Sequence, residues 1–77
     1  MTVSRGEALA TARKLLRTFD SAPEPQKQAR SIYSQLAHVD DLTAPERTQV
    51  DSFGAWLQGR PSQSELKPAC ARLLARF

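Results

Sequence analysis

This chain of 77 residues has very little of the residue types that build metal centres, disulfide frameworks and β-sheets. It contains one cysteine, Cys70, and one histidine, His38, which are too few for an intramolecular disulfide or for a zinc site of cysteine and histidine ligands. We therefore expect neither a structural metal nor a bound cofactor. Valine and isoleucine together number four, whereas alanine, leucine, glutamine, glutamate, lysine and arginine dominate. Because strand formers are scarce and helix formers abundant, the composition predicts an all-α protein.

Long apolar runs are also missing. No segment approaches the roughly 18 consecutive apolar residues of a membrane span, and residues 1–6 lack the apolar stretch of a signal peptide. A hydrophobic fraction of 40% and a charged fraction of 25% are typical of globular proteins, so we expect residues 1–77 to form a single helical domain. Eight arginines, eleven alanines and no asparagine suggest a GC-rich genome. We expect a protein of the bacterial cytoplasm. If a phage encodes the protein, we expect it in the cytoplasm of the host.

Three clusters of turn-forming residues, at 21–25, 40–45 and 59–64, divide the chain into four segments of helical length. Each segment carries apolar residues at spacings of three and four, the pattern of a helix with one buried face. The predicted fold is a compact bundle of four short helices. Its expected core is Leu9, Leu16, Phe19, Ile32, Leu36, Phe53, Leu57, Leu66, Leu73 and Leu74.

Local signals mark where these helices begin and end. Ser4, followed three residues later by a glutamate, predicts a capping box, and Thr43 with Glu46 predicts a second and stronger one. Gly59 is the expected left-handed residue that ends the third helix. Pro68 removes a backbone hydrogen-bond donor, so we expect the regular part of the fourth helix from about residue 65, with distortion before the proline.

The residues with reactive side chains each have a structural interpretation beside a catalytic one. His38 precedes two carboxylates, a setting in which a histidine can act as an acid or base, but a histidine in the last turn of a helix is favourable without any catalytic role. Cys70 follows a lysine yet shares a helix face with leucines, which predicts burial. Asp40 and Asp41 are typical of a turn rather than of a metal pair. We therefore expect a protein that is not an enzyme.

Two aromatic residues are candidates for binding a partner. The inward stripe of the third segment consists of Val50, Phe53 and Leu57, and Trp56 lies beside this stripe. An aromatic side chain at the margin of a small core is typical of an interface anchor, although Trp56 would also widen the core. Tyr33 in the second segment admits the same two interpretations.

Basic residues raise a DNA-binding alternative, a helix-turn-helix-like unit at about residues 35–53. The apolar and capping positions of the usual pattern fit this stretch. However, Asp41 stands where the turn prefers glycine, and Asp40 and Glu46 bring negative charge toward phosphates. The residues that would reach base edges are Arg47, Thr48 and Gln49.

The remaining arginines suggest a basic face for an acidic protein or a phosphate backbone, provided that the first and fourth segments pack side by side. Its members would be Arg13, Arg17, Arg72 and Arg76. Taken together, the sequence favours a small helical protein that binds another protein, as a bacterial or phage regulator, inhibitor or adaptor. A homodimer is a further expectation, because burial of Trp56 or Tyr33 between two copies would supplement a modest core.

Overall fold

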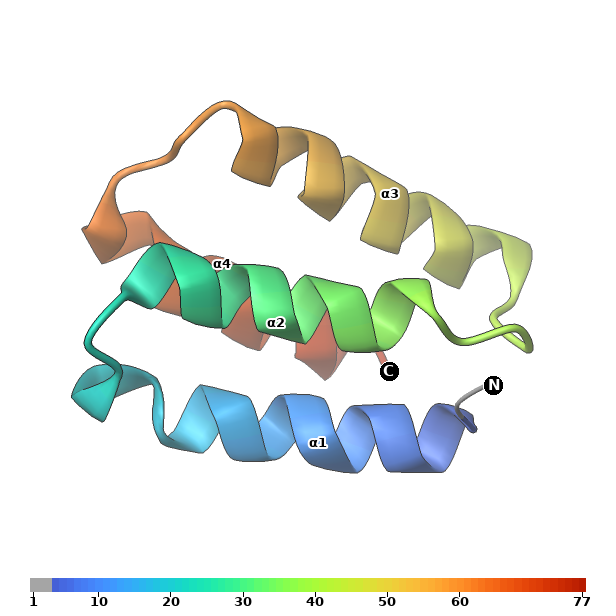
Figure 1. Cartoon of the computed structure of the whole chain (residues 1–77). Helices are drawn as coiled ribbons and strands as arrows, with labels where there is room; N and C mark the ends of the chain where they lie inside the picture. Colours follow the sequence, from blue (N-terminus) through green and yellow to red (C-terminus); the bar gives the residue numbers. More distant parts are fainter. Residues whose placement is uncertain (1–3) are drawn as a thin grey trace.

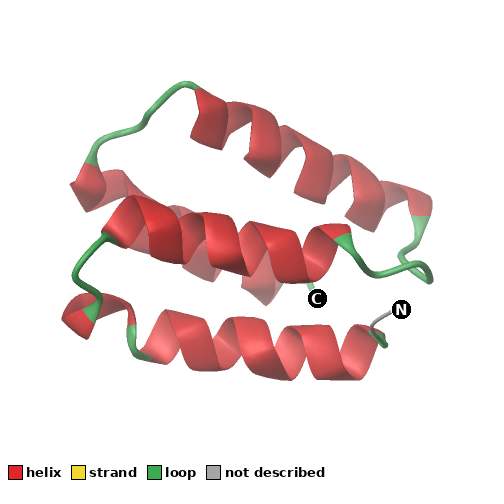
Figure 2. Ribbon diagram, in the orientation of Figure 1, coloured by secondary structure: helices red, strands yellow, loops and turns green. Residues whose placement is uncertain are grey.

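The structure is a computed structural model that describes residues 4–77, and the regular elements of this part of the chain are all helices, without strands. Its α-helices are α1 (Arg5–Arg17), α2 (Pro25–Ala37), α3 (Ala44–Gln58) and α4 (Gln63–Ala75). A single 3₁₀ turn, η1 (Phe19–Ser21), connects α1 to α2. The fold class predicted from composition is thus confirmed (Figures 1 and 2).

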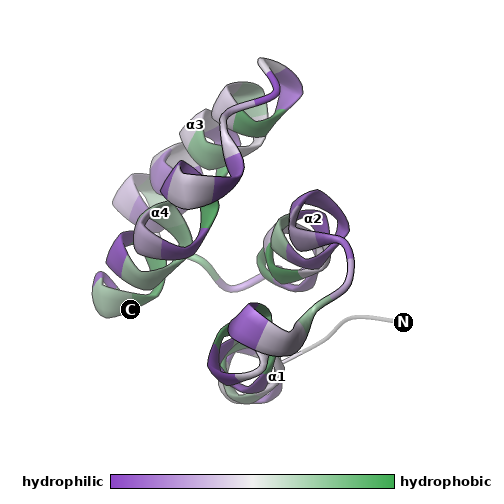
Figure 3. Cartoon of the chain, turned by 90° about the vertical axis from the view of Figure 1, so that its left-hand side faces the viewer, coloured by the Kyte–Doolittle hydropathy of each residue, from purple (hydrophilic) through white to green (hydrophobic). Residues whose placement is uncertain are grey.

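The other three helices pack around α2, which contacts each of them. The chain reverses direction after each helix, so that α2 runs back along α1 and α3 runs back along α2 (Figure 1). The end view in Figure 3 places α1 and α2 on one side of the bundle and α3 and α4 on the other. α4 also packs on α1, but it touches α3 only sparsely. The space between α3 and α4 is therefore the place where the bundle is least closed.

The core lies between these helices and contains nearly all the predicted residues. Nine of the ten expected core residues are buried, and the tenth, Leu16, is half-buried and packs against the others. Val50 and Cys70, which share faces with those leucines, are fully buried as well. Burying each large aliphatic side chain contributes about 1.5 to 3 kcal/mol, so this cluster is the main source of stability.

The helix starts follow the local signals closely. At α3 the Thr43 hydroxyl accepts from the Glu46 amide at 3.3 Å, and the Glu46 carboxylate accepts from the Thr43 amide at 3.0 Å. This reciprocal pair confirms the predicted capping box. At α1 the Ser4 hydroxyl accepts from the Glu7 amide at 3.2 Å, which is one of the two hydrogen bonds of the capping box predicted there.

Two predicted helix boundaries need correction. Gly59 ends α3 with a φ of −76°, and the left-handed residue is instead its neighbour Arg60, with a φ of 54°. α4 begins at Gln63 rather than near residue 65, and it continues through Pro68 without a break. The pyrrolidine ring is tolerated because Pro68 lies on the exposed side of the helix, where the carbonyl one turn earlier can turn to water.

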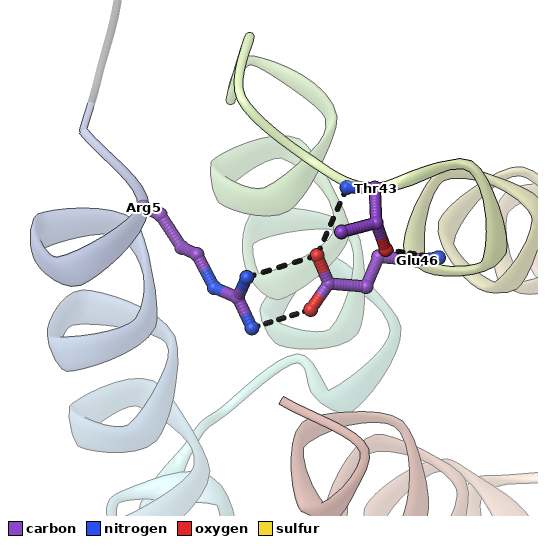
Figure 4. Close-up of polar contacts among 3 residues, drawn as sticks. All are labelled: Arg5, Thr43 and Glu46. Carbon is purple, nitrogen blue, oxygen red and sulfur yellow. Dashed lines mark hydrogen bonds and ion pairs between the residues drawn. The ribbon is translucent and has the colours of Figure 1, made fainter.

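One ion pair holds the first residue of α1, and a second holds η1, just after the last residue of α1. The Arg5 guanidinium contacts both carboxylate oxygens of Glu46 at the start of α3, one of them through a 3.0 Å hydrogen bond (Figure 4). Arg5 also lies over the Phe77 ring, with its central carbon 5.7 Å from the ring centroid. At the opposite end, Lys67 of α4 contacts Asp20 of η1 at 2.6 Å. These contacts join parts of the chain that are far apart in sequence.

Candidate functional site

The clearest candidate site is an open groove between α3 and α4, with a volume of about 410 Å³. It occurs where these two helices make few contacts with each other, because both face mainly α2. We call it the α3–α4 groove. Its lining residues are Gln49, Phe53, Trp56, Ala69, Arg72, Leu73 and Arg76.

Aromatic and aliphatic side chains form the apolar part of the groove. Trp56 is half-buried and packs on Phe53, with ring centroids 5.6 Å apart and planes tilted by 34°. Across the groove, α4 presents Leu73, which is buried, and Ala69, whose small side chain leaves room beside the indole. The groove thus offers a partly exposed aromatic surface, which water solvates poorly. Such a surface is the usual place for an apolar side chain of a partner protein to bind.

Two arginines form the charged part of the groove. Arg72 lies in the last turn of α4 and Arg76 is the residue just after its end, and both are exposed. Among residues 4–77, no carboxylate lies within 4.0 Å of either guanidinium, whereas Arg5, Lys27 and Lys67 each have one. Glu65, two turns before Arg72 on α4, is exposed and does not line the groove. The charge along this wall is therefore positive and uncompensated.

Tyr33 and Trp56, the two predicted aromatic anchors, lie on different sides of α3. Tyr33 lines a smaller hollow of about 280 Å³ between α2 and α3, together with Gly54. Its half-buried ring rests directly on Gly54, where a methyl group would approach the ring to 2.6 Å. The two aromatic residues therefore do not belong to one surface: Trp56 lies beside Arg72 and Arg76, whereas Tyr33 lies beside Arg30, which likewise has no carboxylate within 4.0 Å among residues 4–77.

The four predicted arginines of the basic face are also divided between two places. Arg72 and Arg76 line the α3–α4 groove. Arg13 and Arg17 are exposed on α1, a helix that contributes no residue to this groove. The groove therefore has two of the four guanidinium groups, and it has them beside an aromatic residue.

The residues proposed to read DNA face three different environments. Arg47 is half-buried and donates hydrogen bonds to the carbonyl oxygens of Ala37, at 3.3 Å, and Val39, at 2.6 Å. It therefore caps the end of α2. Thr48 is exposed, and its hydroxyl donates to a carbonyl one turn earlier at 3.1 Å, whereas Gln49 lines the α3–α4 groove.

The connection between α2 and α3 also differs from a helix-turn-helix. It contains six residues, 38–43, whereas that motif joins its helices by three or four and lets them cross steeply. Here α3 runs back along α2 (Figure 1). To contact DNA, the Arg47 guanidinium would have to break its hydrogen bonds to the two carbonyl oxygens. The DNA-binding alternative therefore stays a prediction without geometric support.

None of the reactive side chains that the sequence singled out lines the α3–α4 groove. His38 is exposed at the end of α2, where its Nδ1 atom lies 2.6 Å from the carbonyl oxygen of Ser34. Cys70 is buried in the core, and burial raises the pKa of its thiol from 9.0 to about 11. Asp40 and Asp41 are exposed in the connection between α2 and α3. These placements match the structural interpretation that the sequence favoured for each residue.

Sequence reasoning identified only part of the groove. Trp56, Arg72 and Arg76 were predicted to bind a partner, but Ala69 gave no signal, and Phe53 and Leu73 were assigned to the core alone. What links them is the separation of α3 from α4, a property of the packed bundle. Amphipathic periodicity predicts which face of a helix is buried, but it does not say which two helices leave a gap.

Residues 4–77 contain no helix that is long and apolar enough to cross a membrane, and no group of three or more His, Cys, Asp or Glu residues placed to hold a metal ion. Comparison of the chain with protein-family models, with curated proteins and with solved structures found no match.

Proposed function

We propose that this protein acts by binding another protein through the α3–α4 groove, as a non-enzymatic regulator, inhibitor or adaptor. The observation that carries the proposal is the juxtaposition of a half-buried indole, Trp56, with two exposed arginines that have no carboxylate partner within residues 4–77. Tryptophan and arginine are the residue types most enriched at the energetic centres of protein interfaces.

The dimensions of the molecule support binding rather than catalysis. The chain exposes 4985 Å² of surface, and an ordinary interface takes about 800 Å² per partner, so one face can hold a complete interface. The α3–α4 groove is open, and neither His38 nor Cys70 lines it. A partner side chain would fit there, but no nucleophile or general base faces it.

DNA binding through residues 35–53 is the second candidate, and it is less well supported. The guanidinium of Arg47 already caps α2 through two hydrogen bonds to backbone carbonyl oxygens, and Gln49 lines the α3–α4 groove. A DNA-reading form would have to break these contacts first. Duplex DNA therefore serves as one arm of the experiments below.

A displayed library of random peptides tests whether the groove is the preferred binding surface. Selected peptides are titrated against the native chain, Trp56→Ala and Tyr33→Ala. Tyr33→Ala is the matched control, because Tyr33 is a half-buried aromatic residue of α2 that lies on the other side of α3 from the groove. We expect Trp56→Ala to weaken binding by about 2 kcal/mol or more, roughly 30-fold, with little effect of Tyr33→Ala. Equal effects, or a larger effect of Tyr33→Ala, would place the interface elsewhere.

A further inference from the structure

Resting on the proposed function, we infer that the occupant of the α3–α4 groove is an acidic amphipathic helix of a partner protein. An apolar side chain of this helix enters beside Trp56, and two of its carboxylates pair with Arg72 and Arg76. Nothing but the chemistry of the groove identifies this partner.

The spacing of the arginines supports a helical occupant. Arg72 in the last turn of α4 and Arg76 at its C-cap are four residues apart, and Arg76 keeps a helical backbone conformation, so their backbones are separated by about 6 Å along the helix axis. Carboxylates three or four residues apart on a partner helix have the same separation. Helices of 13 and 15 residues, such as α4 and α3, are about 20 Å long, and they can flank a partner helix over three to four turns.

Charge complementarity favours an acidic partner. The wall formed by α4 carries two positive charges without a carboxylate within 4.0 Å in the described part of the chain. The α3 side contributes Gln49, which is uncharged and able to donate or accept a hydrogen bond. A basic helix would be repelled, and a neutral one would leave both guanidinium groups unpaired beside an apolar surface.

A second copy of the chain is a poorer occupant of the same groove. In a two-fold dimer each surface meets itself, so the Arg72 and Arg76 pairs of both copies would come together. Four guanidinium groups would then share one interface without a carboxylate from the groove residues. A nucleic acid would satisfy the arginines through its phosphates, but it would use the apolar wall only if a base stacked on Trp56.

The only tryptophan of the chain provides a direct readout, because Trp56 lies in the groove itself. Three synthetic amphipathic helices without tryptophan are titrated while Trp56 fluorescence is recorded. The first carries glutamates one turn apart, the second carries glutamines at the same positions and the third carries lysines. We expect the glutamate peptide to bind at least 10-fold more tightly than the glutamine peptide at about 50 mM salt, and the advantage to shrink as salt is raised.

Charge reversal provides the matched control. In the double variant Arg72→Glu and Arg76→Glu the preference should invert, so that the lysine peptide binds best. The variant Arg13→Glu and Arg17→Glu makes the same change of net charge on α1 and should keep the original order. The milder Arg72→Gln and Arg76→Gln should lose the preference without inverting it. Far-UV circular dichroism checks that each variant remains folded, as expected for exposed residues.

The possible outcomes separate this inference from the proposed function. Equal binding of the glutamate and glutamine peptides, with both sensitive to Trp56→Ala, would overturn the acidic partner and leave the groove as the interface. Failure of all three peptides to alter Trp56 fluorescence, together with library peptides insensitive to Trp56→Ala, would overturn both. Tighter binding of single-stranded or duplex DNA at the groove would replace the acidic helix by nucleic acid. A dimer in sedimentation that Trp56→Ala dissociates would replace it by a second copy.

Discussion

The contact between Gly54 and Tyr33 predicts that one substitution will have different effects in two backgrounds. Gly54 is buried inside α3, where glycine is less favourable than alanine by about 1 kcal/mol. A methyl group at this position would lie 2.6 Å from two carbons of the Tyr33 ring and 2.8 Å from its hydroxyl oxygen. Helix propensity therefore favours Gly54→Ala, whereas the tyrosine opposes it.

The size of the opposing effect follows from which atoms collide. Overpacking costs about 1 to 3 kcal/mol, and the atoms concerned are the outer end of a half-buried ring that can swing toward solvent. We therefore expect a cost of about 1 kcal/mol, which cancels the gain in propensity to within about 0.5 kcal/mol. In a Tyr33→Ala background the cost disappears, and Gly54→Ala should raise the free energy of unfolding by about 1 kcal/mol.

Urea unfolding followed by circular dichroism measures this coupling through four proteins: the native chain, each single variant and the double variant. Gly6→Ala is the control, because Gly6 lies in α1 with no side chain or other backbone atom near the added methyl group, so its effect should not depend on Tyr33. The same gain from Gly54→Ala in both backgrounds would refute the proposed contact.

Four further substitutions test separate parts of the structure. Thr43→Ala removes the hydroxyl that accepts from the first turn of α3 and should lower the free energy of unfolding by about 0.5 to 2 kcal/mol in urea titrations. Arg60→Gly should raise the free energy of unfolding by about 0.5 kcal/mol, because glycine adopts the left-handed conformation of this position without the strain that arginine has there. Gly59→Ala, at a φ of −76°, should change the free energy of unfolding by less than about 0.5 kcal/mol. A loss above about 1 kcal/mol from Gly59→Ala would restore Gly59 as the left-handed position. Burial raises the pKa of the Cys70 thiol in the folded protein from 9.0 to about 11, so the protonated thiol's contribution to the free energy of unfolding is complete below pH 9 and is lost as the pH rises toward 11. Between these pH values the free energy of unfolding should therefore fall more steeply in the native chain than in Cys70→Ala.

The features that the sequence predicted are those decided within a few residues of one another. The capping box of Thr43 and Glu46 spans one turn, and the leucine stripes repeat within each helix, so both are readable before the helices are assembled. The left-handed residue of the following loop was assigned to Gly59 because glycine adopts that conformation most easily. In the structure Arg60 adopts it, because the path from α3 to α4 decides which residue must turn.

The candidate site depends on how helices are placed, and this is where the sequence alone was insufficient. Periodicity placed Trp56 beside the inward stripe of α3, but it did not show that α4 would bring Arg72 and Arg76 to the same groove. Likewise, Arg47 was a candidate for reaching base edges in the DNA-binding alternative, and its hydrogen bonds to the end of α2 and the following loop depend on how the chain returns after residue 37. Each of these contacts joins separate helices, which local patterns do not describe.

The ion pair at the start of α1 and the one at η1, just after its end, differ in exposure, so salt should loosen the two ends of α1 unequally. The side chains of Arg5 and Glu46 are 35% and 13% exposed, whereas those of Lys67 and Asp20 are 48% and 77% exposed. Dissolved ions screen exposed pairs more effectively than partly buried ones. Added salt will thus release the η1 end before the Arg5 end. Amide hydrogen exchange measured at increasing ionic strength should therefore become faster first in the last turn of α1 and later in its first turn.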